Sequence, residues 1–581
     1  MITDLAKNAP ALYQAFQDDL RKAEGESHFM RNSGKYPLCG RGDINVYTVF
    51  AELNRALTGP GGRIGCIVPS GIATDDTTKY FFQDIVETNT LANLYDFENR
   101  NGLFAGVHRS YKFCLLTLRT PSPHALLTTH YSPLAPSDFV FFALHPDDLR
   151  EPDRHFALSA EDIALLNPNT RTCPIFRSKA DAELTKAIYR RVPVFRREIS
   201  EENGSACKIE APWAAEITRT FDMARFGTKA RTLSSLEREG LIYQGSRLAN
   251  KEEWVPILES KTFWHFDHRA ATYANVEESE AAKGNCRELC ESEKQSASTL
   301  VLGRYYLPKP IVDQYTAFYN KPYWLAYRNI TNTTNERTFV GTILPRHSSD
   351  YTVRLIFGGK VEGILAGCLI ASLDSDVFDY VARQSIAGTN LSDYLMKQLP
   401  VPPPNIYSQS CIWINEAQTL CHFLLPRVLE LTYTAWDLEP FAQDCGWKGP
   451  PFRWDEERRF LLRCELDAAF FHLYLPAGAS GEWRVASRED GCPYDETPEQ
   501  LAELKKHFPT PRHAVDYIMD TFPIVKRKDE AAYGHYRTKD TILDIYDAMQ
   551  RAIATGEPYQ TRLDPPPADP RCCHPPKGGA K

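Results

Sequence analysis

The chain has 581 residues, of which 43% are hydrophobic and 12% aromatic, and its formal net charge at pH 7 is −8. This length predicts roughly three or four domains with hydrophobic cores. The acidic balance excludes a general nucleic-acid coat, although it allows a reader of DNA sequence with a local basic groove. Scattered cysteines, the absence of a leader pattern in residues 1–25 and the lack of any apolar run of membrane length predict a cytoplasmic protein with reduced thiols and no membrane partner.

The first 120 residues predict alternating helices and strands. Residues 1–30 predict a helix with Leu5, Leu12, Phe16 and Leu20 inward. Residues 43–58 predict a second helix with an apolar face of Val46, Val49, Phe50, Leu53 and Leu57. After a Gly-Pro-Gly-Gly turn, the apolar run Ile64–Val68 is typical of a strand buried on both faces. Pro69-Ser70-Gly71 ends that strand in a loop, and ligands of open α/β sheets bind at such strand ends.

Residues 35–120 resemble adenine-N6 DNA methyltransferases of the amino class, which carry a helix, a GPGG-type turn and a strand ending in Val-Pro. Phe81, Phe82, Ile85 and Val86 continue the likeness as an amphipathic helix, and Leu91–Phe97 and Tyr111–Leu118 follow as two strands. In that family the two strands form the closing hairpin of the catalytic sheet, and its turn holds an aromatic residue that stacks on the flipped base. Phe104 matches this position; packing under the hairpin is its alternative role.

Two motifs of that family have no counterpart in the sequence. One is the glycine-rich loop that holds S-adenosylmethionine, and the other is the catalytic Asn/Asp-Pro-Pro-aromatic tetrapeptide. Asp564-Pro565-Pro566-Pro567 lacks the aromatic residue, and Asn167-Pro168-Asn169-Thr170 has one proline. The resemblance therefore implies that no catalytic or cofactor-binding residue lies in this chain. It also implies that the chain alone binds no S-adenosylmethionine and that a complementing N-terminal methyltransferase fragment supplies both functions.

Residues 160–560 resemble, more weakly, type IIG-like restriction–modification enzymes and related phage-defence methylases. We therefore expect an α/β fold that begins with the C-terminal part of a Rossmann-like methyltransferase sheet, followed by a mixed α+β target recognition domain and a helical C-terminal region. The expected boundaries are 1–120 for the catalytic half-domain, 121–204 for a connecting segment with a basic helix, 205–404 for the recognition domain, 405–560 for the helical region and 561–581 for a disordered tail. Helices are expected at Asp455–Leu475 and Lys539–Ala552, and the charged insertion Glu277–Ser298 is expected to be disordered.

Three segments carry side chains suited to DNA. The first, Tyr327–Arg346, contributes Arg328, Asn329, Thr331, Asn335, Arg337, Thr338 and Arg346. Arginine pairs with guanine edges, asparagine with adenine, and threonine with phosphate or the thymine methyl group. The resembled recognition domains carry a similar Arg-x-Ile…Asn-Glu-Arg-Thr run. A polar hairpin that satisfies its own backbone is the alternative for this segment.

The second segment, Ser375–Pro400, places Arg383, Gln384, Thr389 and Asn390 in a helix and glycine loop. A capped helix with a glycine turn is the equal alternative. The third is the basic helix around Ala180–Arg191, where Arg190 and Arg191 predict either phosphate contact or a solvated helix face.

His265, Asp267 and His268 fall within four residues of a predicted strand, where alternate side chains diverge, so no metal site is predicted. The resemblance implies a site-specific adenine-N6 DNA methyltransferase of a restriction–modification or phage-defence system, with S-adenosylmethionine as methyl donor. In that case this chain supplies DNA recognition and part of the catalytic sheet, and its partners are double-stranded DNA and the complementing fragment. The alternatives are a stand-alone DNA-specificity subunit for a separate methylase or nuclease, and an inactive gene remnant.

Overall fold

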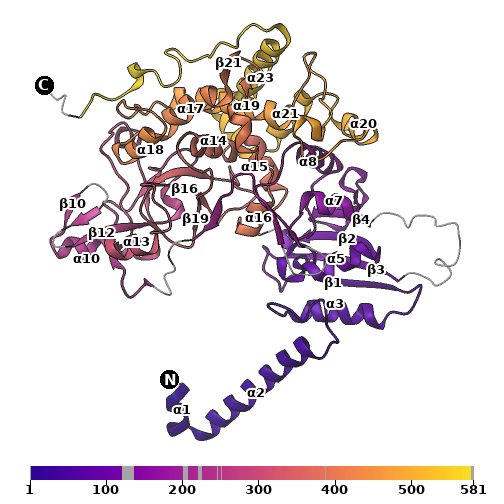
Figure 1. Ribbon diagram of the computed structural model, residues 1–581. Helices are drawn as coiled ribbons and strands as arrows, with labels where there is room; N and C mark the ends of the chain where they lie inside the picture. The colour runs from indigo at the N-terminus through magenta and orange to yellow at the C-terminus, as the bar shows by residue number, and fades with distance from the viewer. Residues whose placement is uncertain are drawn as a thin grey trace. The chain divides into compact units, whose positions relative to one another are not determined.

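The computed structural model describes residues 2–120, 137–200, 207–219, 221, 226–244, 247–249, 252–386 and 388–577. The chain divides into two compact units, Met1–Lys186 and Ala187–Lys581, here called unit 1 and unit 2 (Figure 1). Unit 1 thus continues beyond the expected boundary at residue 120. No helix in the described ranges is both long enough and apolar enough to cross a membrane.

Unit 1 is built on a five-stranded sheet with the order β1-β3-β2-β4-β5. β3 lies between β1 and β2 and is antiparallel to both, β2 pairs in parallel with β4, and β4 is antiparallel to β5. The predicted closing hairpin is therefore present as β2 and β3, and its returning strand pairs with β1. The bounds are β1 (Arg63–Pro69), β2 (Leu91–Glu98), β3 (Lys112–Arg119), β4 (Ser137–Ala143) and β5 (Phe156–Leu158).

The helices of unit 1 begin with α1 (Ile2–Asn8), α2 (Pro10–Asn32), α3 (Val46–Leu57), α4 (Gly71–Thr74), α5 (Lys79–Glu87) and α7 (Ala160–Leu166), and α8 (Lys179–Arg191) leads into unit 2. α5 buries Phe81, Phe82, Ile85 and Val86, as the periodicity predicts. α2 has no buried residue, so the expectation that Leu12 and Leu20 point inward is wrong.

α3 forms where the sequence predicts it, but most of its apolar face is exposed. Phe50 is 58% exposed, and Val46 and Leu57 are also exposed, whereas Glu52 is buried. Glu52 faces inward because its carboxylate accepts the N–H groups of Leu38 at 3.0 Å and Cys39 at 2.8 Å.

β1 is an outer strand of its sheet and is not buried on both faces, contrary to the prediction. Ile67 is 58% exposed, and Val68 is the one buried residue of β1. Unit 1 therefore exposes hydrophobic side chains of α3 and β1.

Unit 2 contains a six-stranded sheet, ordered β10-β11-β12-β15-β9 with β18 paired to β12, and a four-stranded sheet, ordered β17-β16-β19-β8. Trp324 of β16 and Leu344 of β17 belong to the core cluster between them, together with Leu258 and Phe263. The bounds are β8 (Glu216–Thr218), β9 (Arg231–Thr232), β10 (Ile242–Gln244), β11 (Arg247–Ala249), β12 (Glu253–Leu258), β15 (Tyr305–Pro308), β16 (Tyr323–Arg328), β17 (Gly341–Pro345), β18 (Ser348–Ser349) and β19 (Val353–Phe357). Three two-stranded pairs complete the strands: β6 (Arg197–Ser200) with β7 (Cys207–Glu210), β13 (Ala271–Thr272) with β14 (Arg287–Glu288), and β20 (Ser410–Cys411) with β21 (Asn415–Thr419).

The later helices of unit 2 gather on one side of β16 and β19 (Figure 1). Among them, α19 is largely buried and packs against α17 and α23. The helices are α10 (Leu233–Arg238), α11 (Glu278–Lys283), α12 (Glu291–Lys294), α13 (Lys309–Tyr315), α14 (Gly363–Leu373), α15 (Asp376–Arg383), α16 (Asp393–Gln398), α17 (Leu420–Thr432), α18 (Glu439–Asp444), α19 (Glu456–Tyr474), α20 (Pro498–His507), α21 (Pro511–Asp520), α22 (Pro523–Tyr533) and α23 (Arg537–Thr555).

Two segments that were expected to be disordered are folded. Residues 277–298 contain α11, β14 and α12, and Arg287 pairs with Glu293 at 2.8 Å. In the described part of the expected tail, residues 561–577, Cys573 forms a β-bridge with Phe452 and the N–H of Ala568 donates to Glu430 at 2.9 Å. The prediction of disorder rested on charge and proline content. It is wrong because polar groups of both segments have partners on helices.

Candidate nucleic-acid interface

Two of the three segments singled out in the sequence meet in unit 2. The chain after β16 and the loop after α15 form a β-bridge between Ile330 and Asn390. The N–H of Thr331 donates to the carbonyl of Thr389 at 3.0 Å, and the N–H of Leu391 donates to the carbonyl of Asn329 at 2.8 Å. Polar residues about sixty positions apart in the sequence thereby share one surface.

Arg337, which was expected to contact DNA, lies in the interior and is 9% exposed. Its Nη1 donates to Asp376 at 2.6 Å, and its Nη2 donates to the carbonyl of Asp374. Burial alone would lower the pKa of Arg337, but Asp376 and Asp379 raise it. The guanidinium therefore neutralises buried carboxylates and is not available to DNA in this conformation.

Asp379 and Arg383 of α15 organise the same loop from within. Asp379 accepts the N–H of Thr338 at 2.7 Å, and Arg383 donates to that carboxylate at 3.0 Å. Arg383 also donates to the carbonyls of Asn335 at 3.1 Å and Glu336 at 2.7 Å. Thr338 and Arg383, both expected to touch DNA, therefore hold the loop in shape.

Other expected contacts also point inward: Asn329, Thr331 and Gln384 are buried. Arg328 lies 4.6 Å over the ring of Trp264 and donates to the carbonyl of Phe263, and burial lowers its pKa to about 10. Arg346 donates to the carbonyl of Thr316 at 3.0 Å.

The basic helix contributes neither a phosphate site nor a solvated face at its end. Arg190 and Arg191 are both buried in unit 2. Arg191 donates to both carboxylate oxygens of Glu496, at 2.6 and 3.0 Å, and to the carbonyl of Arg484 at 3.0 Å. Glu496 lies some 300 positions further along the chain, so no local pattern announces this ion pair.

What remains on the surface is a set of short amide and hydroxyl side chains. Asn335, Thr389 and Asn390 of the predicted set are exposed. Asn332 and Thr334, which were not among the predicted residues, lie beside Asn335. The Asn332 side chain accepts hydrogen bonds from the N–H and the hydroxyl of Thr334, both at 3.0 Å. We call this surface the polar rim; it comprises Asn332, Thr334, Asn335, Thr389 and Asn390.

A basic run on α22 adjoins the polar rim and also escaped the sequence analysis. Lys528 pairs with Glu336, the neighbour of Asn335, at 2.5 Å. Lys526 and Arg527 precede it on the same helix, and the side chain of Arg527 is exposed. The Lys-Arg-Lys run was visible in the sequence, but its place beside the rim depends on the fold.

Phe104 lies in the turn between β2 and β3 of unit 1. Its ring packs edge-on against Phe113, with centroids 4.9 Å apart, yet 41% of the residue is exposed. Asn99 holds the turn, because its side chain donates to the carbonyl of Phe104 at 3.0 Å and accepts the N–H of Phe104 at 2.9 Å. The ring thus packs under the hairpin on one side and keeps an open side.

The histidine-rich segment has separate partners for each side chain. His265 bonds to the carbonyl of Asp374 at 2.9 Å, His268 to Asp437 at 3.0 Å, and Asp267 to Lys294 at 2.7 Å. Across the described residues, no group of three or more His, Cys, Asp or Glu side chains is arranged to hold a metal ion.

No protein-family model and no curated protein matches the sequence. Two solved structures that are similar to this chain are a restriction–modification enzyme and a restriction endonuclease. The type IIL restriction–modification enzyme MmeI in complex with DNA aligns with a TM-score of 0.35 and 10% identity, covering 81% of this chain and 52% of that one. The type IIG restriction endonuclease BpuSI aligns with a TM-score of 0.24 and 13% identity, covering 76% of this chain and 51% of that one. The chain spans about half the length of either structure, and at these TM-scores neither likeness decides its function.

Proposed function

We propose that this chain reads duplex DNA through the polar rim and forms part of an adenine-N6 DNA methyltransferase of a restriction–modification or phage-defence system. In this proposal a complementing methyltransferase fragment supplies the S-adenosylmethionine site, and this chain alone binds no cofactor. The exposed side of Phe104 stacks on the flipped base.

The strand order of unit 1 is the observation that carries the methyltransferase part of the proposal. β3 inserts between β1 and β2, antiparallel to both, so the hairpin closes onto the strand that ends in Val68-Pro69. The resemblance to amino-class methyltransferases implies this pairing. It supports the proposal because the sequence motifs and the strand pairing agree at the same residues.

The uncovered side chains of unit 1 support a complementing fragment. β1 is an outer strand, and an open edge accepts a further strand by backbone hydrogen bonds. Phe50 and Ile67 are more than half exposed, and their burial would stabilise a complex by about 25 cal/mol per Å² of apolar surface. A fragment that adds a strand to β1 and covers α3 satisfies both.

The polar rim and the basic run supply complementary parts of DNA recognition. Asparagine amides can pair with adenine edges, and threonine hydroxyls bond to bases or phosphates. Lys526 and Arg527 provide charge for phosphate contacts, which set affinity and its salt dependence. We propose that Asn335 and Asn390 read bases while Arg527 holds the backbone.

A stand-alone DNA-specificity subunit is the second candidate, favoured because the rim and the basic run lie together within unit 2. Co-expression with the reading frames adjacent to this gene, followed by mapping of N6-methyladenine, separates the two candidates. If N6-methyladenine appears only with a partner whose catalytic sheet lacks its own closing hairpin, the result supports an enzyme in which this chain and the partner share one sheet. Modification by a partner with a complete catalytic sheet supports the specificity subunit, and no DNA binding with any partner contradicts both.

A further inference from the structure

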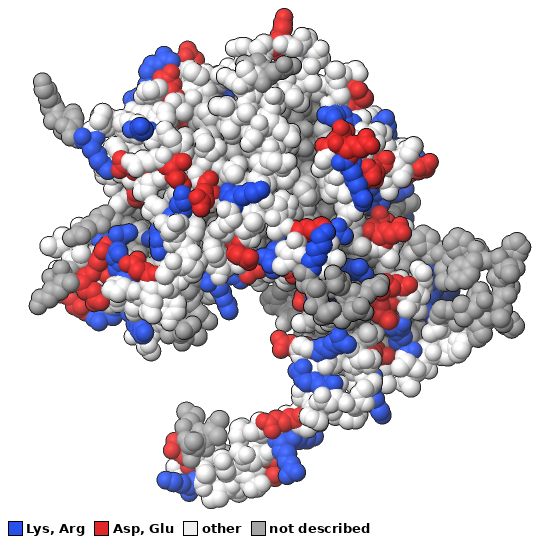
Figure 2. Space-filling model, viewed as in Figure 1, with Lys and Arg blue, Asp and Glu red and all other residues white. Residues whose placement is uncertain are grey.

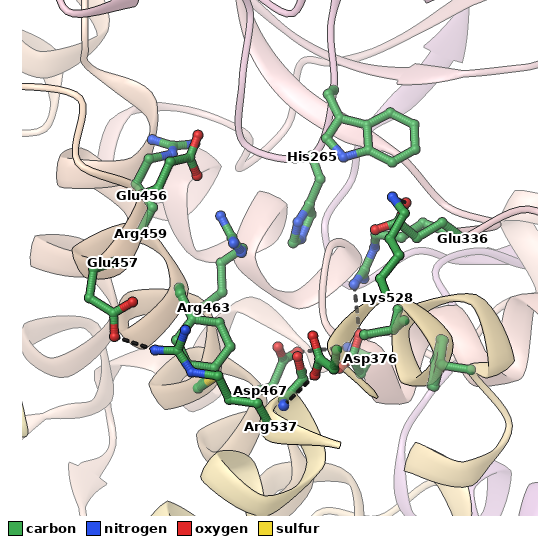
Figure 3. A pocket seen from close by; sticks show the side chains of 18 of the residues that line it. His265, Glu336, Asp376, Glu456, Glu457, Arg459, Arg463, Asp467, Lys528 and Arg537 are labelled. Carbon is green, nitrogen blue, oxygen red and sulfur yellow. Dashed lines mark hydrogen bonds and ion pairs between the residues drawn. The ribbon is translucent and has the colours of Figure 1, made fainter. Parts of the chain in front are cut away.

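A cavity of about 420 Å³ lies in unit 2, walled by α19 and α22 and by residues around Trp264 and Asp376. Charged side chains dominate its lining, and Figure 3 shows them converging from several elements. Its lysines and arginines are Lys294, Arg337, Arg459, Arg463, Lys528 and Arg537. The volume is within the range of sites for small ligands.

Most of these cations are already paired. Lys294 pairs with Asp267 at 2.7 Å, Arg337 with Asp376 at 2.6 Å and Lys528 with Glu336 at 2.5 Å. Arg537 pairs with Glu457, a contact drawn as a dashed line in Figure 3. These pairs neutralise one another and leave two arginines of α19 to consider.

Arg459 is 3% exposed and has no carboxylate partner within ion-pair distance in the described chain. Its guanidinium lies 3.7 Å over the ring of Trp454 and donates to the carbonyl of Leu431 at 2.6 Å, while its Nε has no acceptor. Burial lowers the pKa of Arg459 to about 10. Asp267 and Glu456 attract this buried guanidinium from beyond ion-pair distance, so no described carboxylate contacts it directly.

Arg463 follows one helical turn later and lines the same cavity. It forms no hydrogen bond or ion pair with a described residue, and Figure 3 shows it projecting into the space between Arg459 and His265. Burial, then Arg337 and Arg463, hold the pKa of His265 well below its usual value. The inner wall therefore presents two guanidinium groups that form no ion pair with a described carboxylate.

The remaining acids of the lining have partners other than these two arginines. Asp467 accepts the N–H of Asp376 at 2.7 Å, and burial, followed by the neighbouring Asp376, raises its pKa well above its usual range. Asp529 accepts the N–H of Thr538 at 2.6 Å, and Glu456 accepts the indole N–H of Trp454 at 2.8 Å. An external anion is the simplest partner for the two arginines.

We propose that this cavity binds a phosphoryl group through the guanidinium groups of Arg459 and Arg463. Guanidinium forks match the oxygens of phosphate in a bidentate manner. The phosphoryl group belongs either to a free phosphate or nucleotide or to a nucleic-acid backbone. The proposal does not rest on DNA recognition, because a free phosphate satisfies the same two side chains.

Calorimetry on the full chain with inorganic phosphate and with AMP, at constant ionic strength, tests the site. We expect saturable binding that weakens about tenfold or more in Arg463→Gln, because hydrogen bonds to charged groups are lost. Arg463→Lys should retain part of the affinity. The matched control is Arg551→Gln, which removes an exposed charge of α23 outside the cavity and should leave binding unchanged.

Oligonucleotides identify the source of the phosphoryl group. If a free phosphate or nucleotide is the ligand, Arg463→Gln loses AMP binding and keeps duplex binding. If the backbone is the ligand, Arg463→Gln weakens duplex binding about tenfold or more and AMP competes with the duplex. If Arg463→Gln leaves the binding of phosphate, AMP and duplex unchanged, the proposal is overturned. AMP binding without any duplex binding contradicts only the proposed function.

Discussion

Arg337 lies among several buried acids, one of which, Asp379, also pairs with Arg383, and this makes it the centre of a buried charge network. Its Nη1 lies 2.6 Å from Asp376, and the carboxyl groups of Asp374 and Asp379 contribute to the same field. Removing one partner of a buried ion pair leaves the other charge uncompensated, which costs about 3–5 kcal/mol. The residue therefore acts through stability.

Arg337→Met should lower the free energy of unfolding by about 3–5 kcal/mol in a denaturant titration. Asn335→Ala, two residues away but exposed, should change it by no more than about 0.5 kcal/mol. An Arg337→Met protein with wild-type stability and weakened DNA binding would return this arginine to the interface.

Asp350 gives the stability a pH dependence with a defined sign. Burial raises its pKa to about 6 from the usual 3.8. Below the unfolded-state pKa the carboxyl is protonated in both states; between pH about 4 and about 6 only the unfolded state ionises freely, so stability falls as pH rises. Asp350→Asn should remove this component, worth roughly 1–3 kcal/mol. If the difference in unfolding free energy between wild type and Asp350→Asn is constant from about pH 4 to about pH 7, this assignment is contradicted.

The sequence identified residue types correctly around Arg337 but not their burial. Arginine, asparagine and threonine serve equally as DNA contacts and as internal donors, and the choice depends on Asp374, Asp376 and Asp379, some forty positions later. The Asn335 side chain is exposed and has no such partner among the described residues. Long-range electrostatic partners are set by tertiary packing and leave no local signature.

At the scale of elements, α3 and β1 show what periodicity can predict. The spacing of Val46, Phe50 and Leu57 located the helix and its apolar face, and the hairpin β2–β3 formed close to its predicted bounds. Which side faces the protein was decided by Glu52, whose carboxylate is bound by two backbone N–H groups. The apolar periodicity of one segment does not show whether another segment covers its apolar face.

β1 should exchange its amide hydrogens faster than β2 and β3. It has a neighbouring strand on one side in the described sheet, whereas β2 and β3 are paired on both sides. Hydrogen-exchange mass spectrometry on the full chain measures this difference. Equal protection of residues 63–69 and 112–119 would mean that another segment covers the β1 edge.

Replacing exposed apolar side chains of unit 1 should reduce self-association without unfolding the protein. Phe50→Ser with Ile67→Thr removes two residues that are each 58% exposed, and sedimentation should show fewer large species. Val49→Ser, on the same helix but buried, should instead lower stability by about 1–3 kcal/mol. Unchanged self-association of the double variant would show that these two side chains do not form the surface through which the protein self-associates.

For the whole molecule, the proposed DNA recognition requires a local arrangement, because the net charge is −8. On the face drawn in Figure 2, described lysines and arginines alternate with aspartates and glutamates. The polar rim beside Lys526 and Arg527 is such an arrangement, since it combines amide groups with a short basic run. Its assembly from residues near 335, 390 and 527 is a property of the fold, which explains why segment-by-segment inspection found only part of it.

Selection of bound sequences from a random duplex pool, with the full chain as the bait, tests the central claim most directly. The wild-type chain should enrich one sequence motif, and Asn335→Ala with Asn390→Ala should lose that preference while still binding DNA. Arg527→Gln should weaken binding uniformly and lower the slope of log K against log salt by about 1. The control Gln295→Ala, an exposed amide outside the rim, should enrich the wild-type motif. A wild-type chain that enriches no motif, or a rim variant that enriches the same motif as wild type, contradicts DNA recognition through the polar rim.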